Sequence, residues 1–443
     1  MKMVILGNGF DLSSGLPTSY KDYFKYYNST KNEALTTIKE FMNLKMKSNG
    51  KFLKGTNDYD KDRLKEREIS EKLSPYMDDI SLFARDKTIS IWNLYFWYSD
   101  KSSQTSNENR NWSNVERQIS QLIEDYFNKN VSIITFIGKD QKISSIEKNL
   151  AERLKLINYK SQYDSLSISR KQYSQDIFFR FEKEDRFRFI CDLLLMKRYG
   201  TKCESDYLSI LKRELELFEE NFRKYIANIS ETQINSNKKN IGIYRNNFFK
   251  VTNNKESPFF ILNFNYTDFS SNEKKESVLI RRDNKPIDVE QMNVHGVYYS
   301  KIILGIDQTD QDQEKFYKFT KTYRKMELYD EIPVTKMPKP QDVDEIIIYG
   351  HSLSIADYSY FHSIFDYYNI YSSDIIVNFT YSLFGDKSNH ENLKSKHVQN
   401  IMRLLKFYGD KMFDRERGKN LVHKMLLENR LIIKEVTLDS LEK

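Results

Sequence analysis

The N-terminal residues constrain the fold more than any other part of the chain. An apolar run at residues 3–6 leads directly into the turn sequence GNGFD (residues 7–11), and Gly-Leu-Pro follows at residues 15–17. A strand that ends in Gly-x-Gly can turn tightly, and its backbone can approach a phosphate or a ribose because no Cβ intervenes. Leu12 stands where the usual dinucleotide fingerprint has its next glycine. Gly-x-Gly alone favours a plain tight turn, whereas the whole string favours a ligand-binding loop ahead of a helix that opens at Tyr20.

Short apolar runs in the second half of the chain predict the remaining strands. They lie at residues 259–264, 301–306, 345–349 and 374–379, with a further run in the tail at residues 431–436. Runs of this length between polar or helical segments are typical of buried strands in a mainly parallel sheet. We therefore predict an α/β fold.

The middle of the chain is predicted to be helical. From about residue 31 to residue 248, apolar residues recur at spacings of three and four, for example at residues 112–127 and 177–197. The sheet would then be built from both ends of the chain, and the tail would add a helical C-terminal extension. The expected boundaries are residues 1–30 and 256–443 for the sheet domain and residues 31–255 for a large, mostly helical insertion.

The bulk composition limits the classes of function. A net charge of +7 from 70 basic and 63 acidic residues allows contact with nucleic acid but does not indicate it. The two cysteines, Cys191 and Cys203, are too few for a four-cysteine zinc site, and we expect neither zinc nor another metal. The sequence has no signal-peptide pattern and no run of about 18 apolar residues. We therefore expect a cytoplasmic protein without membrane contact.

A second candidate motif follows the apolar run at residues 259–264. It delivers Asn265, Tyr266 and Asp268 to the carboxyl end of a strand, where ligands bind in open α/β sheets. An asparagine at this position can fix a water molecule or a ribose hydroxyl. The alternative is an Asn/Asp turn that simply ends the strand, and the residues alone do not separate the two interpretations.

A third candidate is the pair His295-Gly296, just ahead of the predicted strand at residues 301–306. Histidine is the side chain best suited to move protons near neutral pH, and Gly296 would let a substrate lie close to it. The alternative is a hydrogen-bonded structural histidine, which is the commoner role of a single histidine.

A fourth candidate follows the strand at residues 345–349, where the chain continues as GHSLS (residues 350–354) and then opens a helix. Hydroxyl and free N–H groups at a strand-to-helix turn suit a nucleotide. The alternative is ordinary helix capping by Ser354 or Asp357.

These four segments, in this order, resemble the nucleotide-binding segments of sirtuins. The resemblance implies a sirtuin-like, Rossmann-type fold that binds NAD, with His295 as general base on the ribose. For cleavage of NAD we expect His295 to be the general base or a partner of a ribose hydroxyl, Asn265 to position a water, and Asp11 to hold a ribose or to assist orientation. His351 takes the place of a Thr or Tyr, so its role stays open. The positions that we then expect to contact the nucleotide are Gly7, Asn8, Gly9, Gly15, Tyr266, Asp268, Gly296, Gly350, Ser352 and Ser354.

The opening from Asn8 to Tyr20 is still more similar to the bacteriophage abortive-infection family AbiH, and the segment NWSNVE (residues 111–116) adds to this resemblance. Glu116 of that segment has two interpretations. It is an acid that stabilises the first turn of a capped helix, or its side chain turns toward the ligand pocket. The zinc-binding cysteines of sirtuin deacylases are missing, and Thr18 stands where those enzymes begin a Phe-Arg pair. We therefore do not expect removal of acyl groups from lysine.

The resemblance to AbiH implies phage defence by death or dormancy of the host cell. The first hypothesis is hydrolysis of NAD at the nicotinamide–ribose bond. The second is a nucleotide-binding sensor without turnover, and the third is an effector that binds or processes nucleic acid, for which the sequence has no compelling carboxylate–lysine cluster. The helical insertion would sense a phage-derived trigger or mediate homo-oligomers.

Overall fold

The computed structural model describes residues 1–29, 33–43, 79, 82–83, 89–102, 115, 118–119, 190–191, 194–195, 198–199, 207–235, 238–253, 258–268, 289–306, 317–329, 335–383, 387–412 and 414–441. Its strands are β1 (Lys2–Leu6), β2 (Phe259–Asn263), β3 (Val289–Asn293), β4 (Glu345–Tyr349), β5 (Ile376–Tyr381) and β6 (Leu431–Glu435). Its helices are α1 (Gly9–Ser13), α2 (Tyr20–Ser29), α3 (Glu33–Asn43), α5 (Ile91–Ser102), α10 (Tyr207–Ile229), α11 (Lys238–Thr252), α13 (Lys321–Glu327), α14 (Tyr358–Tyr367), α15 (His390–Lys411), α16 (Arg415–Lys419) and α17 (Leu421–Leu427). A π-helical turn, η2 (Ser230–Asn235), and short 3-10 helices, η3 (Tyr317–Phe319), η5 (Pro340–Asp342), η6 (Ile355–Asp357) and η7 (Lys387–Asn389), complete the described elements.

The strands form one sheet in which all neighbours are parallel. Their order is β3-β2-β1-β4-β5-β6, so the first strand lies near the middle and later strands add on both sides. β1, β2 and β4 are apolar and almost entirely buried, as expected where helices cover both faces of a parallel sheet. This arrangement confirms the predicted α/β fold with a mainly parallel sheet, and its strand order is that of Rossmann-type folds.

One of the predicted strands is wrong. The apolar run at residues 301–306 does not join the sheet, and the edge strand is instead β3, Val289–Asn293, which pairs with β2. The run at residues 301–306 is held as a loop, with an isolated bridge between Gly296 and Ile302. Ile302, Ile303 and Leu304 are buried, so the apolar pattern indicates burial rather than strand pairing. The sequence pattern does not predict β3, because this edge strand is only partly buried and its sequence is polar.

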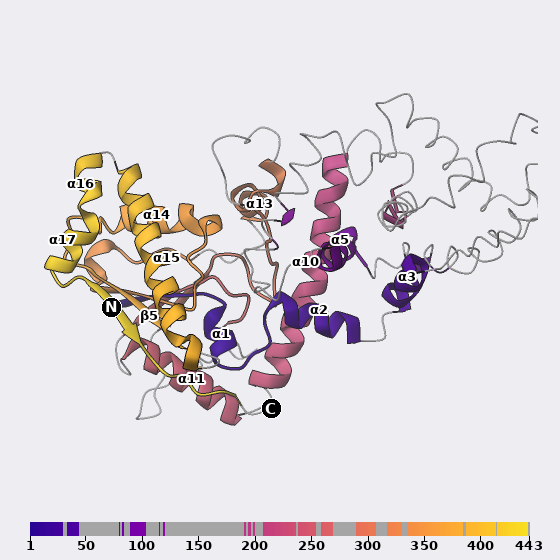
Figure 1. The fold of residues 1–443 in the computed structure, drawn as a ribbon, viewed down its shortest axis with the longest axis horizontal. Helices are drawn as coiled ribbons and strands as arrows, with labels where there is room; N and C mark the ends of the chain where they lie inside the picture. The colour runs from indigo at the N-terminus through magenta and orange to yellow at the C-terminus, as the bar shows by residue number, and fades with distance from the viewer. Residues whose placement is uncertain are drawn as a thin grey trace, which may run out of the picture. The chain divides into compact units, whose positions relative to one another are not determined.

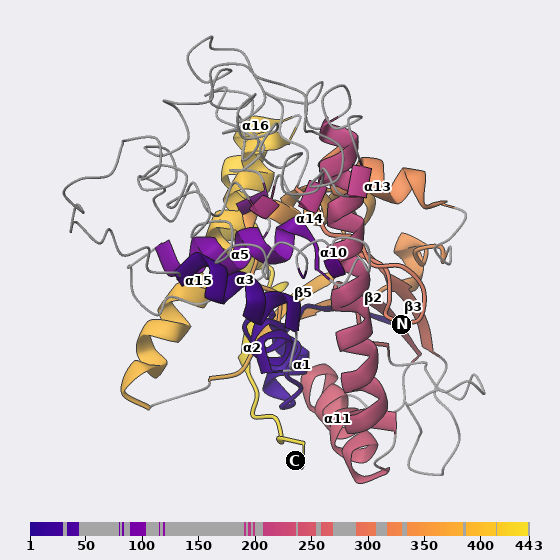
Figure 2. The same cartoon turned by 90° about the vertical axis from the view of Figure 1, so that its right-hand side faces the viewer.

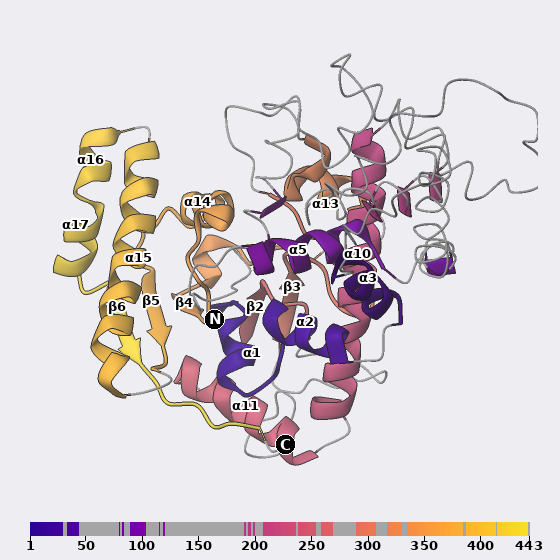
Figure 3. The same ribbon diagram turned by 45° about the vertical axis from the view of Figure 1, so that its right-hand side comes forward.

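The two faces of the sheet pack against different helices. On one face, Met3 of β1 belongs to a core that also contains residues of α14, α15 and α17. On the other face, Phe259 of β2 packs edge-on against Phe248 of α11. Phe10 of α1 packs in the same way against Tyr349 of β4. Figures 1 and 3 show α14, in orange, on one side of the strands and α11, in pink, on the other.

The start of α2 agrees with the sequence prediction. Tyr20 is its first residue, and the side chain of Ser19 accepts a hydrogen bond from the backbone N–H of Asp22 at 3.1 Å. Ser19 therefore satisfies one of the N–H groups that the first turn of a helix leaves open, which fixes where the helix begins.

The C-terminal segment belongs to the sheet domain. β6 pairs with β5 at the edge of the sheet, so the predicted helical extension contains a strand as well as α15, α16 and α17. Beyond β6, Asn247 of α11 exchanges hydrogen bonds with the backbone of Asp439. The N–H of Leu441 donates to the carbonyl of Ser14 at 2.8 Å. Figure 2 shows this yellow segment running beside α11.

The chain divides into two compact units. The unit with the sheet consists of Met1–Tyr23, Asn109–Ile119 and Glu219–Lys443, and the second unit consists of Phe24–Glu108 and Ser120–Phe218. The helical segments predicted at residues 112–127 and 177–197 lie mostly outside the described residues, and so does Cys203. In the described parts of the chain, no helix combines the length and the apolar character needed to cross a bilayer.

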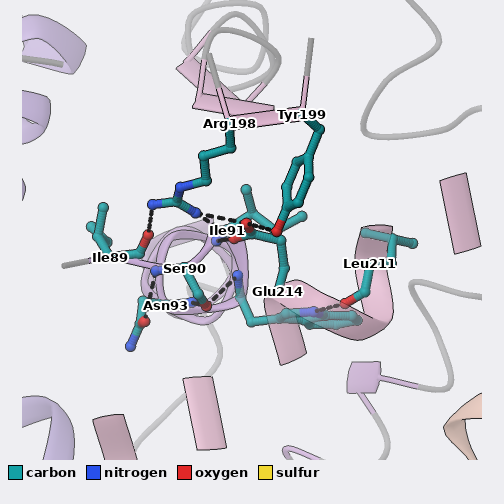
Figure 4. A network of polar contacts seen from close by, with 9 residues as sticks. Ile89, Ser90, Ile91, Asn93, Arg198, Tyr199, Leu211 and Glu214 are labelled. Atoms are coloured by element: carbon teal, nitrogen blue, oxygen red, sulfur yellow. Dashed lines mark hydrogen bonds and ion pairs between the residues drawn. The ribbon is translucent and has the colours of Figure 1, made fainter. Parts of the chain in front are cut away.

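A buried ion pair connects described residues of the second unit. The carboxylate of Glu214 on α10 is fully buried and lies 2.7 Å from the guanidinium of Arg198. It also accepts hydrogen bonds from the hydroxyl of Tyr199 at 3.0 Å and from the N–H of Ile91 at 2.9 Å (Figure 4). Ile91 is the first residue of α5, so the carboxylate also faces the positive end of that helix.

Candidate functional site

The four segments singled out from the sequence lie at one edge of the sheet. β1, β2, β3 and β4 end in register, because Leu6 pairs with both Asn263 and Tyr349, and Asn263 pairs with Asn293. The first and fourth segments begin directly after Leu6 and Tyr349, and Asn265 and His295 lie two residues beyond Asn263 and Asn293. In sheets with this strand order, ligands bind at the carboxyl edge beside the point where the order reverses, which here lies between β1 and β4. The fold therefore brings the segments to the edge that binds ligands in related architectures.

The two glycine turns at this edge pack against each other. A Cβ on Gly9 would lie 2.6 Å from the carbonyl oxygen of Gly350, and one on Gly7 would lie 2.5 Å from the Cα of His351. The N–H of Gly9 donates to the carbonyl of Gly350 at 2.7 Å, and the N–H of Phe10 donates to the carbonyl of Gly7 at 2.9 Å. The glycines thus permit close backbone packing, and these N–H groups could bind a phosphate only if the turns opened.

Asn8 and Gly15 complete the first turn. The side-chain oxygen of Asn8 accepts a hydrogen bond from the hydroxyl of Thr18 at 2.7 Å. Its amide nitrogen is buried and has no partner among the described residues. Gly15 has a φ of 93° and lies beside the backbone of Leu441. Of these two residues, only Asn8 leaves a polar side-chain atom open for a ligand.

Asp11 is a buried acid whose two oxygens already have partners. Its side chain accepts hydrogen bonds from the hydroxyl of Tyr244 at 2.6 Å and from that of Thr267 at 2.9 Å. Burial raises the pKa of Asp11 to about 6, although both hydroxyls act in the opposite direction. The carboxyl group therefore connects α1 with α11 and with the loop after β2.

Asn265 lies in a loop that another asparagine holds in place. The side chain of Asn263 donates to the carbonyl of Thr267 at 2.7 Å and accepts from the N–H of Asn265 at 3.0 Å. The side chain of Asn265 is 3% exposed, and neither its oxygen nor its nitrogen has a partner in the described structure. A buried amide without partners costs about 1–3 kcal/mol, so such a group is a candidate for direct contact with a ligand.

The neighbours of Asn265 turn into the interior. Tyr266 donates its hydroxyl proton to the carbonyl of Ile303 at 3.1 Å, and its ring packs edge-on against Phe222. Asp268 is also buried. Tyr266 therefore fixes the loop after β2 against the loop after β3.

His295 follows β3, two residues after the end of the strand. It is 6% exposed, its Nε2 lies 3.5 Å from the carboxylate of Asp357, and its Nδ1 has no partner among the described residues. The ring packs edge-on against Phe264 and Tyr360. Burial, and to a lesser extent the positive charge of Lys321, lower the pKa of His295 to about 4, although Asp357 acts in the opposite direction. The imidazole is therefore neutral at pH 7.

Gly296 serves a tight turn. Its φ is 83°, and a Cβ at this position would collide with the carbonyl oxygen of Lys301. The N–H of Val297 donates to that same carbonyl at 2.9 Å. The glycine is therefore required by the backbone that places His295, whether or not a substrate approaches it.

One carboxylate joins the third and fourth segments. The ammonium of Lys321 lies 2.7 Å from Oδ1 of Asp357, and Nε2 of His351 lies 3.2 Å from its Oδ2. Burial opposes ionisation of Asp357, but Lys321 and the hydrogen bonds from both histidines outweigh it and hold the pKa well below its ordinary value. Asp357 stands at the N-cap of α14, yet its side chain makes no capping bond. Of the two residues in the alternative interpretation of this segment, Asp357 therefore does not cap the helix with its side chain.

α13 positions the lysine of this cluster. The side chain of Thr320 caps α13 by accepting from the N–H of Tyr323. One turn further on, Arg324 forms a buried ion pair with Glu219 of α10 at 2.8 Å. Glu219 also accepts from the N–H of Leu304 at 2.7 Å. These contacts fix the helix from which Lys321 reaches Asp357.

Ser352 and Ser354 of the fourth segment flank a buried leucine. Ser352 is exposed, and its carbonyl accepts from the side chain of Asn400. Between the serines, buried Leu353 has a φ of 51°. A left-handed backbone at a branched residue costs about 1–2 kcal/mol and is most often retained at functional sites. The carbonyl of Ser354 accepts from the N–H of Asp357 at 3.1 Å.

The comparison with known families decides the assignment. A family model described as bacteriophage abortive infection AbiH matches residues 3–379, which is most of the chain. The chain belongs to the AbiH family. No curated protein and no solved structure matches it. As an AbiH protein it has a role in abortive infection, the form of phage defence that the family description states.

The match to AbiH includes all four segments at the carboxyl edge of the sheet. Glu116, the other AbiH-like position, lies outside the described residues. In the parts of this AbiH protein that the structure describes, no three His, Cys, Asp or Glu side chains are arranged to hold a metal ion.

Sequence reasoning missed two polar residues of this site. The apolar pattern predicts Asn263 correctly as part of a strand, and an asparagine in an otherwise apolar run also indicates a structural side-chain contact. Lys321 gave no signal, because it is 36 residues from Asp357 in sequence.

Proposed function

We propose that this AbiH protein hydrolyses NAD at the bond between nicotinamide and ribose. The observation that carries the proposal is the pair Asn265 and His295, two buried side chains with open polar atoms. They follow neighbouring strands, each two residues beyond the register pair Asn263–Asn293. Because adjacent strands are about 4.8 Å apart, one substrate can contact both residues.

The chemistry needs few groups. The bond between C1′ of the ribose and the pyridinium nitrogen breaks, nicotinamide leaves with the bonding electrons, and the ribose passes through an oxocarbenium-like state. Asn265 would hold the attacking water through its side-chain oxygen. Nδ1 of His295 would take the proton of that water as the new bond to C1′ forms. The products are nicotinamide and ADP-ribose.

The remaining candidate residues would surround the rest of the dinucleotide in the cytoplasm of the infected cell. The amide of Asn8 has an open nitrogen beside the first turn. The closed packing of Gly9 against Gly350 supports a resting state in which the diphosphate contact forms only after a trigger opens the turns.

The direct test is release of nicotinamide from NAD. The full-length protein is incubated with NAD, alone and with extract from phage-infected cells, and NAD is also measured in infected cells that express it. We expect release in the triggered samples, a loss of roughly 100-fold or more in His295→Gln, and a similar loss in Asn265→Ala.

Exposed residues of the same types supply matched controls. His423→Gln on α17 and Asn392→Ala on α15 change exposed side chains and should keep wild-type activity. Intact NAD in triggered wild-type samples would reject hydrolysis. Tight binding of NAD that stays intact, with protection from phage unaffected by His295→Gln, would instead support a nucleotide-binding sensor.

A further inference from the structure

Asp357 is the only described carboxylate that contacts both histidines of the candidate site. We propose that Asp357 is a positioning residue that holds the ring proton of His295 on Nε2 and leaves Nδ1 as the proton-accepting atom. Its catalytic consequence rests on the proposed NAD hydrolysis. The position of the proton does not, because it can be measured without substrate.

One ring nitrogen of His295, Nε2, faces the carboxylate of Asp357. A neutral imidazole has one N–H, and a carboxylate can only accept. Nε2 of His295 lies 3.5 Å from Oδ1 of Asp357, so a proton on Nε2 is attracted, whereas a lone pair there would be repelled. The proton therefore belongs on Nε2. Nδ1 then has a lone pair and, among the described residues, no hydrogen-bond partner.

The carboxylate can impose this choice because both of its oxygens are held. Lys321 binds Oδ1 at 2.7 Å, and His351 faces Oδ2 at 3.2 Å. The proton of His351 is itself fixed, since its Nδ1 accepts from the N–H of Leu353 at 2.9 Å. His351, whose role the sequence leaves open, thus helps to keep Asp357 from rotating.

The charges around His295 set when it can accept a proton. Lys321 and Lys325 of α13 disfavour the imidazolium, and Asp357 favours it. His351 faces the other oxygen of the carboxylate, and Tyr360 of α14 contacts the ring edge-on. The imidazole therefore stays neutral in the resting protein. When Nδ1 takes a proton from water, Nε2–H already points at the carboxylate that stabilises the cation.

The first test reads the proton directly. In protein labelled with ¹⁵N-histidine, Nδ1 of His295 should show the shift of an unprotonated ring nitrogen at pH 7, and Nε2 that of a protonated one. His295→Gln identifies the signals. Wild-type protein with the proton on Nδ1, or with both tautomers equally populated, would overturn the proposal even if no Asp357 variant folds.

The second test removes the carboxylate. Asp357→Asn should populate both tautomers of His295 and lower kcat by roughly 10²- to 10⁴-fold with little change in KM. Asp357→Glu keeps a carboxylate and should restore part of the tautomer preference and part of kcat. Asp366→Asn, an exposed acid on the same helix, is the control and should change neither. An unchanged tautomer in folded Asp357→Asn would refute the positioning role. The expected tautomer without any NAD cleavage would reject the proposed reaction alone.

Discussion

Asp11 and His295 are buried ionisable side chains whose pKa values are displaced in opposite directions. Burial raises the pKa of Asp11 from 3.8 to about 6 and lowers that of His295 from 6.5 to about 4. Each displacement favours the neutral form of its side chain. An environment that excludes water from both groups makes added polar contacts strong, which suits the handling of a charged substrate.

These displacements affect stability with opposite signs. The folded state holds the proton of Asp11 more tightly than the unfolded state does, so the stabilising contribution is lost as the pH rises from about 4 to about 6. His295 behaves in the reverse way, and its contribution is gained as the pH rises from about 4 to about 6.5. Each amounts to about 3 kcal/mol. The two contributions nearly cancel in the wild-type protein.

In a variant without the Asp11 carboxyl group, the pH dependence of the free energy of unfolding should show the contribution of His295. In Asp11→Asn, the free energy of unfolding relative to wild type should rise by about 3 kcal/mol between pH 4 and pH 6, whatever its value at one pH. Denaturant unfolding at several pH values measures this slope. A difference between variant and wild type that does not change with pH would show that the carboxyl group titrates normally in the folded protein.

At the scale of elements, the contact between the turns after β1 and β4 sets the geometry of the candidate site. Gly350 has a φ of 71°, and a Cβ there would lie 2.3 Å from the backbone nitrogen of Phe10. The neighbouring backbone cannot move away without disturbing β1, which lies between two hydrogen-bonded strands.

A methyl group at this contact should be costly. Gly350→Ala should lower the free energy of unfolding by roughly 2–4 kcal/mol, because it adds both a strained φ and a backbone collision. Gly242→Ala is the control, since a Cβ on this α11 glycine would have nothing within 4 Å. That change should be neutral or stabilising by up to about 1 kcal/mol. Equal stability of the two variants would contradict the close packing of the turns.

For the whole molecule, the sequence predicted what depends on local pattern. The runs at residues 259–264 and 345–349 became buried strands, and the glycine turn, Asn265 and His295 lie at one edge of the sheet because parallel strands end together. The strand predicted at residues 301–306 was wrong, because apolar residues indicate burial and not pairing with a neighbouring strand. Strand β3 has too few apolar residues to be recognised.

Contacts between distant parts of the chain could not be predicted. Arg324 and Glu219 are 105 residues apart, and each alone is typical of an exposed helix position. Only the folded chain shows that they pair in the interior and hold α13 in place. Local sequence places Asp357 at the start of a helix and offers capping as one interpretation, whereas tertiary contacts with Lys321 and two histidines determine the orientation of its side chain.

The central claim is that the open polar atoms of Asn265 and His295 face a bound adenine dinucleotide. A crystal structure of the full-length protein with ADP-ribose, the product that keeps both ribose rings and the diphosphate, tests it most directly. We predict ligand density across the carboxyl ends of β1, β2, β3 and β4, with a ribose hydrogen-bonded to the amide of Asn265 and lying against Nδ1 of His295. ADP-ribose bound elsewhere, with both side chains buried and untouched, would contradict the claim.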